Sequence, residues 1–370
     1  MSIATNHLPL LTFLAALVAI LVLAPDLVAR RRPLAPTLLN ALLPALAMLS
    51  SSAAPAYALL GIASAAMALQ VRRTARVGAI MLSLTALCLL ACAMILSGEA
   101  ATEAAFVLSM TALLLRLGVV GLHAGVSSLC SKAPEIQAQQ FASLLALVLT
   151  HLRFVVQVPI AEFAAAPIVL IGAASALLFA LVSLVQRDLD GLLRASMLMH
   201  GGMMLAAAGA AGRGHYVAAL FVSLTMTLAL AGLSLTVLAL EARVGKVGLQ
   251  QACGRARSFP RLAAAFGLFG AAGVGMPGTS GFIADDLILH ALWSQSVIAT
   301  IAVVLASALL AIATLRAITR TFMGPPITSL APDLLPAERA IALLVILLLF
   351  GIGLVPQLVV GACAGLFEGG

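Results

Sequence analysis

The sequence is poor in charge and in aromatic residues. Asp, Glu, Lys and Arg make up only 9% of its 370 residues, and it has one Trp and two Tyr. Soluble domains carry about 25% charged residues, so this chain could not cover the surface of a water-soluble fold. Instead, 63% of its residues are hydrophobic and its mean hydropathy is +1.18. These values predict an all-α polytopic membrane protein.

Several signatures of soluble chemistry are missing as well. The five Cys form no C-x-x-C pair, so we interpret them as small apolar filler rather than a metal or redox site. No G-x-x-x-x-G-K-[ST] occurs and no G-x-G-x-x-G follows a predicted strand, so ATP-driven transport by this chain alone is not expected. The net charge of +7 lies mostly in short loops between apolar segments. We therefore expect no cofactor, no metal and no nucleic-acid partner.

Long apolar runs make up most of the chain. The first run is about 20 residues long and is followed by Arg30-Arg31-Arg32, so it is better explained as a span than as a signal peptide. The tenth is long and broken at Pro277 to Gly281. We predict about 12 transmembrane spans, over residues 8–29, 35–50, 54–71, 77–97, 101–122, 139–156, 163–186, 191–211, 215–240, 261–292, 296–315 and 336–362.

Basic residues mark one side of these spans. Connections after odd-numbered spans are basic, whereas those after even-numbered spans are neutral or acidic, with Arg213 as the exception. The basic positions are Arg30 to Arg32, Arg72, Arg73, Arg76, Lys132, Arg187, Arg243 to Arg261, Arg316 and Arg320. By the positive-inside rule, both chain ends face away from the cytoplasm.

Ionisable residues also occur at membrane depth. Arg116 is flanked by leucines, and His123 lies seven residues further on, near the same helical face. Several glycines between and after them make a continuous helix unfavourable there. His200 lies within an apolar span between methionines and glycines. Such residues are costly in lipid and are candidates for an ion path.

The second break carries acids. Asp285 and Asp286 directly follow residues 275–281, a run rich in Gly with one Pro, and His290 lies one helical turn after Asp286. A carboxylate at a helix centre costs about 2.5–3.5 kcal/mol on insertion scales. Paired broken helices are typical of inverted-repeat transporters, and the roughly 160 residues between the two breaks suit such a repeat.

Each of these residues also has a simpler explanation. Arg116 could extend to the membrane interface, and His123 could be interfacial. His200 could be a packing histidine with satisfied ring nitrogens. Asp285 and Asp286 could both reach the headgroups if the chain bends there. The residues alone leave these alternatives open.

Three segments, residues 116–134, 188–202 and 275–285, share residues and order with one membrane-protein family. Its patterns read roughly Lys-x-Pro-x-x-Pro-Leu-His-x-Trp-Leu-Pro-x-Ala-His-Ser-x-Ala-Pro, Asp-x-Lys-Arg-Leu-Leu-Ala-Tyr-Ser-Ser-x-x-His-x-Gly, and Gly-Leu-Pro-Gly-Thr-Ser-Gly-Phe followed two residues later by Glu or Lys. The corresponding positions are Arg116, Leu122, His123, Ser131 to Pro134, Leu192, Ser196, His200, Gly202 and Gly275 to Asp285. The chain thus resembles the antiporter-like membrane subunits of complex I, membrane-bound hydrogenases and multi-subunit cation/proton antiporters.

The resemblance implies proton movement along a central polar axis, coupled to a partner complex. Arg116 takes the place of the first-half lysine, and His123 that of the histidine in the first break. Asp285 takes the place of the second-half glutamate or lysine. The resemblance thus assigns roles to Arg116 and His123 in the first half and to Asp285 in the second.

The chain departs from the family pattern in its first half. There is no glutamate between Tyr57 and Gln70, and Ala219 replaces the lysine of a later His-x-x-x-Lys that begins here at His215. Arginine, with a pKa above about 12, does not release its proton as lysine does. A first half-channel built on Arg116 should therefore conduct poorly. The remaining replacements in the first break are Gly118 and Gly121 for the two prolines, Gly125 for the tryptophan and Cys130 for the second histidine.

We therefore expect a reduced antiporter-like subunit, with N-terminal transmembrane helices in residues 1–100, an antiporter-like core in 101–330 and a C-terminal transmembrane helix in 331–370. Its expected location is the bacterial inner membrane. Its expected partners are the lipid bilayer, other membrane subunits and a soluble or peripheral energy-coupling subunit. The candidate proton path comprises Arg116, His123, His200, Asp285, Asp286 and His290.

Three alternatives stay open. The chain could be a scaffold homologue that conducts nothing, which the missing glutamate and lysine favour. It could be the membrane half of an energy-coupled inorganic-carbon uptake complex. It could also be an integral membrane enzyme acting on lipids, although that would need clustered His and acidic residues, and the six His here are scattered.

Overall fold

The fold is helical throughout the residues that the structure describes. These residues of the computed structural model are 8–29, 34–98, 102–133, 136–156, 158, 160–326, 329 and 331–366. The helices are α2 (Leu8–Ala29), α3 (Leu34–Leu49), α4 (Ala53–Val71), α5 (Arg76–Ser97), α6 (Thr102–Leu117), α7 (His123–Lys132), α8 (Gln137–Val155), α9 (Ile160–Leu184), α10 (Leu189–Ala211), α11 (Tyr216–Val244), η2 (Arg255–Arg257), α12 (Pro260–Gly273), α13 (Ser280–Trp293), α14 (Val297–Phe322), α15 (Pro336–Leu354) and α16 (Pro356–Gly365). The predicted basic triplet Arg30 to Arg32 and the motif residue Pro134 lie outside the described residues.

Most helices begin and end within a few residues of the predicted apolar runs, because those runs are bounded by turn residues and caps. Asp188, for example, accepts a hydrogen bond from the backbone N–H of Gly191 at 2.6 Å and so caps α10. Three segments differ: α6 ends at Leu117, before the predicted end at 122, α14 continues to Phe322, beyond the predicted end at 315, and the run 336–362 is divided. The run 336–362 was predicted as a single span, but α15 ends at Leu354 and α16 begins at Pro356. Proline lacks the backbone N–H that a continuous helix needs at this point.

Part of the described chain has the length and hydropathy needed to cross a bilayer. Six such helical stretches occur in the described residues: Ala53–Val71, Arg76–Ser97, Glu162–Leu184, Tyr216–Val244, Val297–Phe322 and Pro336–Leu354. Shorter apolar stretches accompany them: Pro9–Leu21, Thr37–Leu49, Gln139–Val155 and Pro356–Gly365. About 20 apolar residues suffice to cross the hydrocarbon core of a bilayer, so this pattern is that of a polytopic membrane protein.

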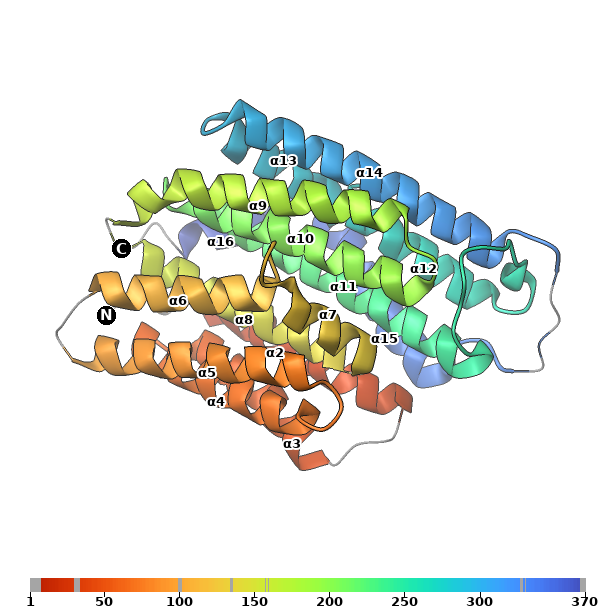
Figure 1. The fold of residues 1–370 in the computed structure, drawn as a ribbon, viewed down its shortest axis with the longest axis horizontal. Coiled ribbons are helices and arrows are strands. Elements are labelled where there is room, and N and C mark those ends of the chain that lie inside the picture. Colours follow the sequence, from red (N-terminus) through yellow and green to blue (C-terminus); the bar gives the residue numbers. More distant parts are fainter. Residues whose placement is uncertain are drawn as a thin grey trace.

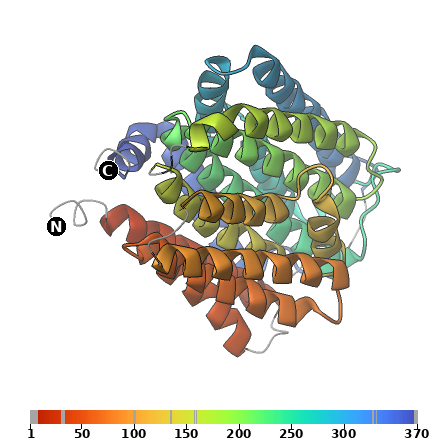
Figure 2. The ribbon, with the colours of Figure 1, turned by 60° about the vertical axis from the view of Figure 1, so that its left-hand side comes forward.

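The helices run side by side as one bundle (Figures 1 and 2). The N-terminal helices α2 to α5 lie on one side, and α9, α13 and α14 lie on the other. α10 and α11 form the centre of the bundle, and almost all of their residues are buried. The connections after α4, α9 and α11, each of which carries basic residues, lie at the right-hand end of the bundle in Figure 1, as does the end of α14 that carries Arg316 and Arg320.

Small residues let α9 and α10 pack closely. A Cβ atom added at Gly172 in α9 would lie 2.7 Å from the carbonyl oxygen of Gly202, and one added at Gly202 in α10 would lie 2.7 Å from the carbonyl oxygen of Gly172. Neither position therefore tolerates a side chain without a backbone shift. Within a membrane, where hydrophobicity does not drive helices together, such close contact is a main source of association. It fixes α10 against the outer helix α9.

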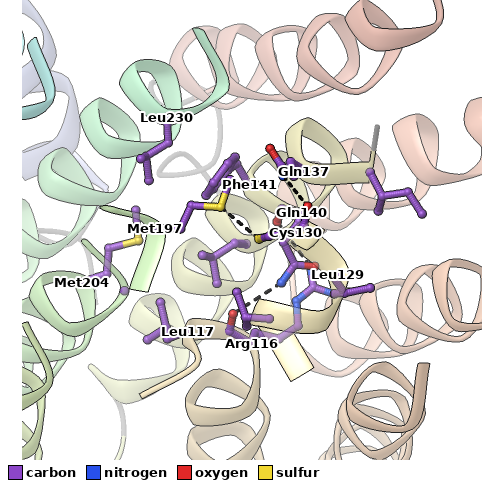
Figure 3. A pocket seen from close by; sticks show the side chains of 14 residues that line it. Arg116, Leu117, Leu129, Cys130, Gln137, Gln140, Phe141, Met197, Met204 and Leu230 are labelled. Atoms are coloured by element: carbon purple, nitrogen blue, oxygen red, sulfur yellow. Dashed lines mark hydrogen bonds between the residues drawn. The ribbon is translucent and has the colours of Figure 1, made fainter. Parts of the chain in front are cut away.

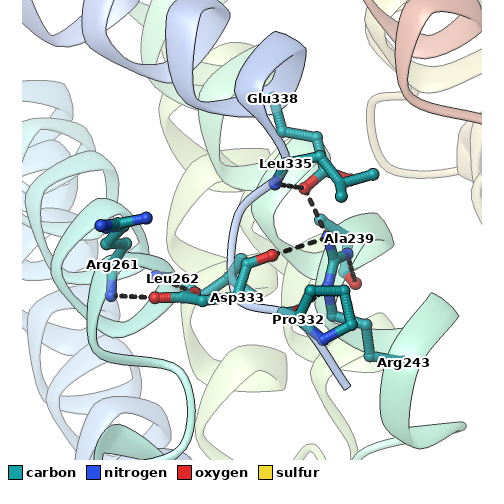
Figure 4. Close-up of polar contacts among 8 residues, drawn as sticks. All are labelled: Ala239, Arg243, Arg261, Leu262, Pro332, Asp333, Leu335 and Glu338. Atoms are coloured by element: carbon teal, nitrogen blue, oxygen red, sulfur yellow. Dashed lines mark hydrogen bonds and ion pairs between the residues drawn. The ribbon is translucent and has the colours of Figure 1, made fainter. Parts of the chain in front are cut away.

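A polar cluster joins α11, α12 and α15 at the basic end of the bundle (Figure 4). Arg243, in the last turn of α11, forms an ion pair with Glu338 of α15 at 2.6 Å, and their side chains are only 8% and 5% exposed. Arg243 also donates to the carbonyl oxygens of Pro332 and Asp333. The Asp333 carboxylate accepts from the first backbone N–H groups of α12, those of Arg261 and Leu262. One short segment thereby ties three helices together.

The Arg243–Glu338 pair is expected to matter for stability because it is buried. Glu338→Gln leaves the guanidinium without its counter-charge, and removing one partner of a buried pair costs about 3–5 kcal/mol. The matched control is Arg339→Gln, because Arg339 is the exposed neighbour of Glu338. Thermal unfolding of the detergent-purified protein should show a clear loss of stability for Glu338→Gln and almost none for the control. Equal unfolding temperatures for the two variants would contradict this account.

Candidate functional site

The second helix break is built from glycines at positive φ. α12 ends at Gly273 and α13 begins at Ser280, and between them Gly275 has φ 72° and Gly278 has φ 89°. Residues with a Cβ rarely adopt this conformation, so glycine is required here. Gly353 of α15 packs directly against this segment, where an added Cβ would lie 2.6 Å from the carbonyl oxygen of Gly278. The break is therefore a packed and defined structure within the bundle.

Asp285 faces this break. Its carboxylate lies against Gly275 so closely that a Cβ added to that glycine would collide with Oδ2. Oδ1 is buried and has no hydrogen-bond partner among the described residues. Buried polar atoms in native proteins are nearly always hydrogen-bonded to protein or to water. A buried carboxyl oxygen without a partner can hold a proton or bind a water molecule.

His200 reaches the same break from the central helix α10. Its side chain is buried, with Nε2 2.8 Å from the carbonyl oxygen of Gly273 and Nδ1 2.7 Å from that of Ser196. A neutral imidazole has one N–H and donates to only one of these oxygens, whereas an imidazolium donates to both. The Gly273 carbonyl also ends α12, where the helix dipole attracts positive charge. Both ring nitrogens of His200 therefore face carbonyl oxygens, one from its own helix and one from the end of α12.

The next residue of α10 contacts the first break. An added Cβ at Gly201 would collide with the carbonyl oxygen of Leu117, the last residue of α6. After Leu117, the chain turns through Gly118 at φ 68° and Gly121 at φ 90° before α7 begins at His123. Two consecutive residues of α10, at 200 and 201, thus touch the C-terminal ends of two helices.

Arg116 lies at the end of α6, just before this contact (Figure 3). It is 2% exposed and donates through Nη2 to the carbonyl oxygen of Gln140 at 3.3 Å and to Ser143 Oγ, both in α8. Its Nε and Nη1 atoms are buried without a partner among the described residues. The charge is held between helices, so it does not extend to an interface.

Small cavities lie beside Arg116 and beside His200. One of about 20 Å³ is lined by Arg116, Gln137, Gln140 and Met197 among others (Figure 3). A second, of about 10 Å³, lies beside His200. A water molecule needs about 10–15 Å³ of such space, so the first can hold a water and the second is at the lower limit.

The other predicted site residues lie elsewhere on the molecule. His123 is exposed at the start of α7, with its ring 5.4 Å from that of Phe179 in α9. Asp286 and His290 pair with each other at 3.4 Å on the outer face of α13, where their side chains are 60% and 80% exposed. Asp285 and Asp286 therefore point in different directions. Of the six predicted residues, the structure brings Asp285 and His200 to the second break and places Arg116 at the end of α6, before the first.

Sequence reasoning missed a set of polar partners on α8. Gln137, Gln140 and Ser143 recur at three-residue spacing, and Gln137 Nε2 donates to the carbonyl oxygen of Cys130 at 3.0 Å. Further along α8, His151 Nδ1 lies 3.1 Å from Ser109 Oγ of α6. The spacing of amides and hydroxyls within an apolar run was the available signal, because it places them on one helical face.

Comparison with known proteins places this geometry in a family. The family model described as NADH:quinone oxidoreductase/Mrp antiporter, TM, matches residues 50–311, more than two thirds of the chain. Comparison with the curated proteins finds no match. The fold resembles a chain of the Mrp complex from Dietzia sp. DQ12-45-1b, with a TM-score of 0.75 and 20% identity over 96% of this chain and 83% of that one.

Two respiratory complexes contain chains of similar fold. One is respiratory complex I from Thermus thermophilus with bound NADH, with a TM-score of 0.76 and 22% identity over 96% of this chain and 84% of that one. The other is the archaeal membrane-bound sulfane sulfur reductase, with a TM-score of 0.81 and 17% identity over 95% of this chain and 65% of that one. The resemblance predicted from the three sequence segments is confirmed: this integral membrane protein belongs to the NADH:quinone oxidoreductase/Mrp antiporter transmembrane family.

Proposed function

We propose that this chain is the proton-translocating membrane subunit of a multi-subunit complex, driven by the reaction of a partner subunit. The observation that carries the proposal is Asp285, whose buried Oδ1 has no hydrogen-bond partner among the described residues and whose carboxylate lies against Gly275. A carboxyl group placed this way can take up a proton without first breaking an ion pair. It can release the proton when water or a neighbouring charge stabilises the carboxylate.

His200 is the second proton carrier in this proposal. It contacts Gly273 and Asp285 contacts Gly275, so the two side chains flank the same break only two residues apart. Protonation of His200 gives each carbonyl acceptor an N–H donor, and deprotonation leaves one contact without a hydrogen. A small movement of α12 relative to α10 would change the distance between His200 Nε2 and the carbonyl oxygen of Gly273. It would therefore change how readily His200 keeps its proton. This is how we expect a conformational change in the partner to act on the site.

Arg116 provides a fixed positive charge in this proposal. Arginine stays protonated, so it does not relay protons. Its Nη2 is held by Gln140 and Ser143 while α6 contacts Gly201, the neighbour of His200. Interaction between charges is strong where the dielectric is low, so a shift of α6 would alter the electrostatic potential at His200. Proton movement is thus confined to the second half, with the first half as its electrostatic control.

The exposed pair Asp286–His290 lies at the outer end of the proposed path, and the exposed His123 lies outside that path, at the first break. Each lies where water, lipid or a neighbouring subunit contacts the chain. The Asp286–His290 pair lies on the exposed face of α13, whereas Asp285 faces the break, so water between the two faces would have to carry protons from Asp285 to this pair. His123, at the first break, lies further from the second break along the chain and would act only if a partner covers it.

The membrane arrangement belongs to the same proposal. We infer about 12 spans, two of them broken, in two inverted repeats within the core of residues 101–330. The C-terminal ends of α6 and α12 both meet α10, as a pair of equivalent broken helices would. With the basic connections on the cytoplasmic side, the chain would lie in a bacterial inner membrane, with other membrane subunits beside it and an energy-coupling subunit on the cytoplasmic face.

A non-conducting scaffold is the second candidate. Arg116 in place of lysine and the absent glutamate between Tyr57 and Gln70 favour it. A membrane half of an inorganic-carbon uptake complex would use the same core. The composition of the native complex separates these cases: redox subunits favour respiration, whereas a single large soluble zinc-type partner favours carbon uptake.

Asp285→Asn should abolish transport while preserving assembly. The amide keeps the shape of the side chain but cannot exchange a proton, and loss of a positioned proton carrier typically costs about 100-fold or more in rate. The measurement is proton uptake by proteoliposomes that contain the assembled complex, with size-exclusion chromatography to check assembly. Glu103→Gln, which neutralises an exposed acid at the start of α6, is the matched control and should transport normally. Unchanged uptake in Asp285→Asn would favour the scaffold.

Arg116→Ala should lower the stability of the protein more than it lowers the rate of proton uptake. Its two hydrogen bonds to α8 would be lost, at about 1.5–3 kcal/mol for each bond to a charged group, whereas Arg116→Lys should keep a positive charge and much of the stability. Thermal unfolding and proton uptake per assembled complex measure the two effects separately. If Arg116→Ala unfolds at the wild-type temperature yet loses nearly all uptake, then Arg116 belongs to the proton relay and the proposed role is wrong.

A further inference from the structure

An open groove runs along the N-terminal hairpin formed by α4 and α5, remote in sequence from both breaks. Its volume is about 760 Å³. Its lining includes small residues, among them Ala65 of α4 and Ala79 and Ser83 of α5, and larger ones such as Ile80 and Leu87 of α5. Ile80 and Leu87 are 61% and 64% exposed. The groove is therefore apolar and open to the surroundings of the chain.

One end of the groove is positively charged. Arg72 directly follows α4 and Arg76 begins α5, so both lie at the hairpin turn, and both line the groove. Both are exposed, and neither forms an ion pair with an acid among the described residues. The turn lies at the end of the bundle that carries the basic connections (Figure 1). One end of the apolar groove thus carries two guanidinium groups, neither of which is paired with an acid in the part of the chain that the structure describes.

We propose that this groove binds an anionic phospholipid, with its phosphate held by Arg72 and Arg76 and an acyl chain lying along the groove. The lining runs from Arg76 to Leu90 on α5, about 21 Å at 1.5 Å per residue. One leaflet of the hydrocarbon core is about 15 Å thick, half of the whole. The groove is therefore long enough for an acyl chain that starts at the interface and descends through its leaflet.

Charge complementarity selects this occupant over a helix of a neighbouring subunit. Guanidinium groups match phosphate in geometry and charge, and they are more weakly hydrated than ammonium groups. An apolar helix would leave both arginines unpaired against hydrocarbon, which is costly. The bound lipid would support the hairpin on its open side.

The test uses the whole complex, purified in detergent, stripped of lipid and then given phosphatidylglycerol or phosphatidylcholine. Native mass spectrometry counts the retained lipid, and thermal unfolding reports stabilisation. The wild type should prefer phosphatidylglycerol, and Arg72→Gln with Arg76→Gln should lower that preference by roughly 30-fold, because each arginine near an anionic surface contributes a factor of about five. The matched control, Arg73→Gln with Arg187→Gln, removes two exposed arginines that do not line the groove and should keep the preference.

A second pair of variants tests the apolar part without changing charge. Ser83→Trp places a large side chain in the groove and should displace the lipid, whereas Val77→Trp, at an exposed position outside the groove, should not. Equal lipid retention in the two arginine double variants would overturn the proposal. So would release of another subunit from the complex by Ser83→Trp, because the groove would then be a protein interface. These results are independent of proton uptake, so the lipid site stands or falls separately from the proposed function.

Discussion

The contact between His200 Nε2 and the carbonyl oxygen of Gly273 joins the central helix α10 to the end of α12. A helix that ends inside a membrane protein leaves carbonyl groups that water cannot easily satisfy. α12 ends in that way, and a buried histidine of α10 meets its last carbonyl at 2.8 Å. One residue later, Gly201 gives the end of α6 room to approach. α10 therefore contacts the ends of both α6 and α12. A movement of either end would change the contacts of His200 or Gly201.

Arg116, in the last turn of α6, and Asp285, which lies in α13 and faces the break after α12, are not equivalent. Neither Arg116 nor Asp285 forms an ion pair among the described residues. Arg116 keeps its charge, while a carboxyl group changes its charge whenever it gains or loses a proton. The arrangement therefore combines one permanent charge with one variable charge, linked through α10. Under the proposed function, only the half that holds Asp285 would change its charge when a partner moves.

The helices could be predicted from the sequence because apolar runs with Gly, Pro and charged boundaries set their length. The second break was visible for the same reason, in the run from Gly275 to Gly281. The sequence did not show in which direction the side chains of Asp285 and Asp286 point. The apolar residues surround these helices on nearly all sides, so the sequence carries little information about which face of α13 is buried, and neighbouring residues differ by about 100° around a helix. Only the packed structure shows that Asp285 faces the break and Asp286 the surface.

Contacts between distant segments were equally invisible. Nothing near Arg243 in the sequence indicates that Glu338 is its partner, because the pair depends on how α11 and α15 meet. The prediction of a single span over 336–362 was wrong. The apolar run is continuous, but the helix is interrupted before Pro356 because proline lacks the backbone N–H that a continuous helix needs. The surface also escaped prediction: the apolar groove of the α4–α5 hairpin arises from small residues on two antiparallel helices, which no single segment reveals.

The account depends most directly on whether Asp285 changes its protonation state during turnover. Infrared difference spectroscopy of the assembled complex can measure this through the carbonyl stretch of a protonated carboxyl group. We predict a band that appears and disappears with turnover, shifts in D2O and is absent in Asp285→Asn. A spectrum in which turnover produces no carboxyl band, or produces one that survives in Asp285→Asn, would contradict the account.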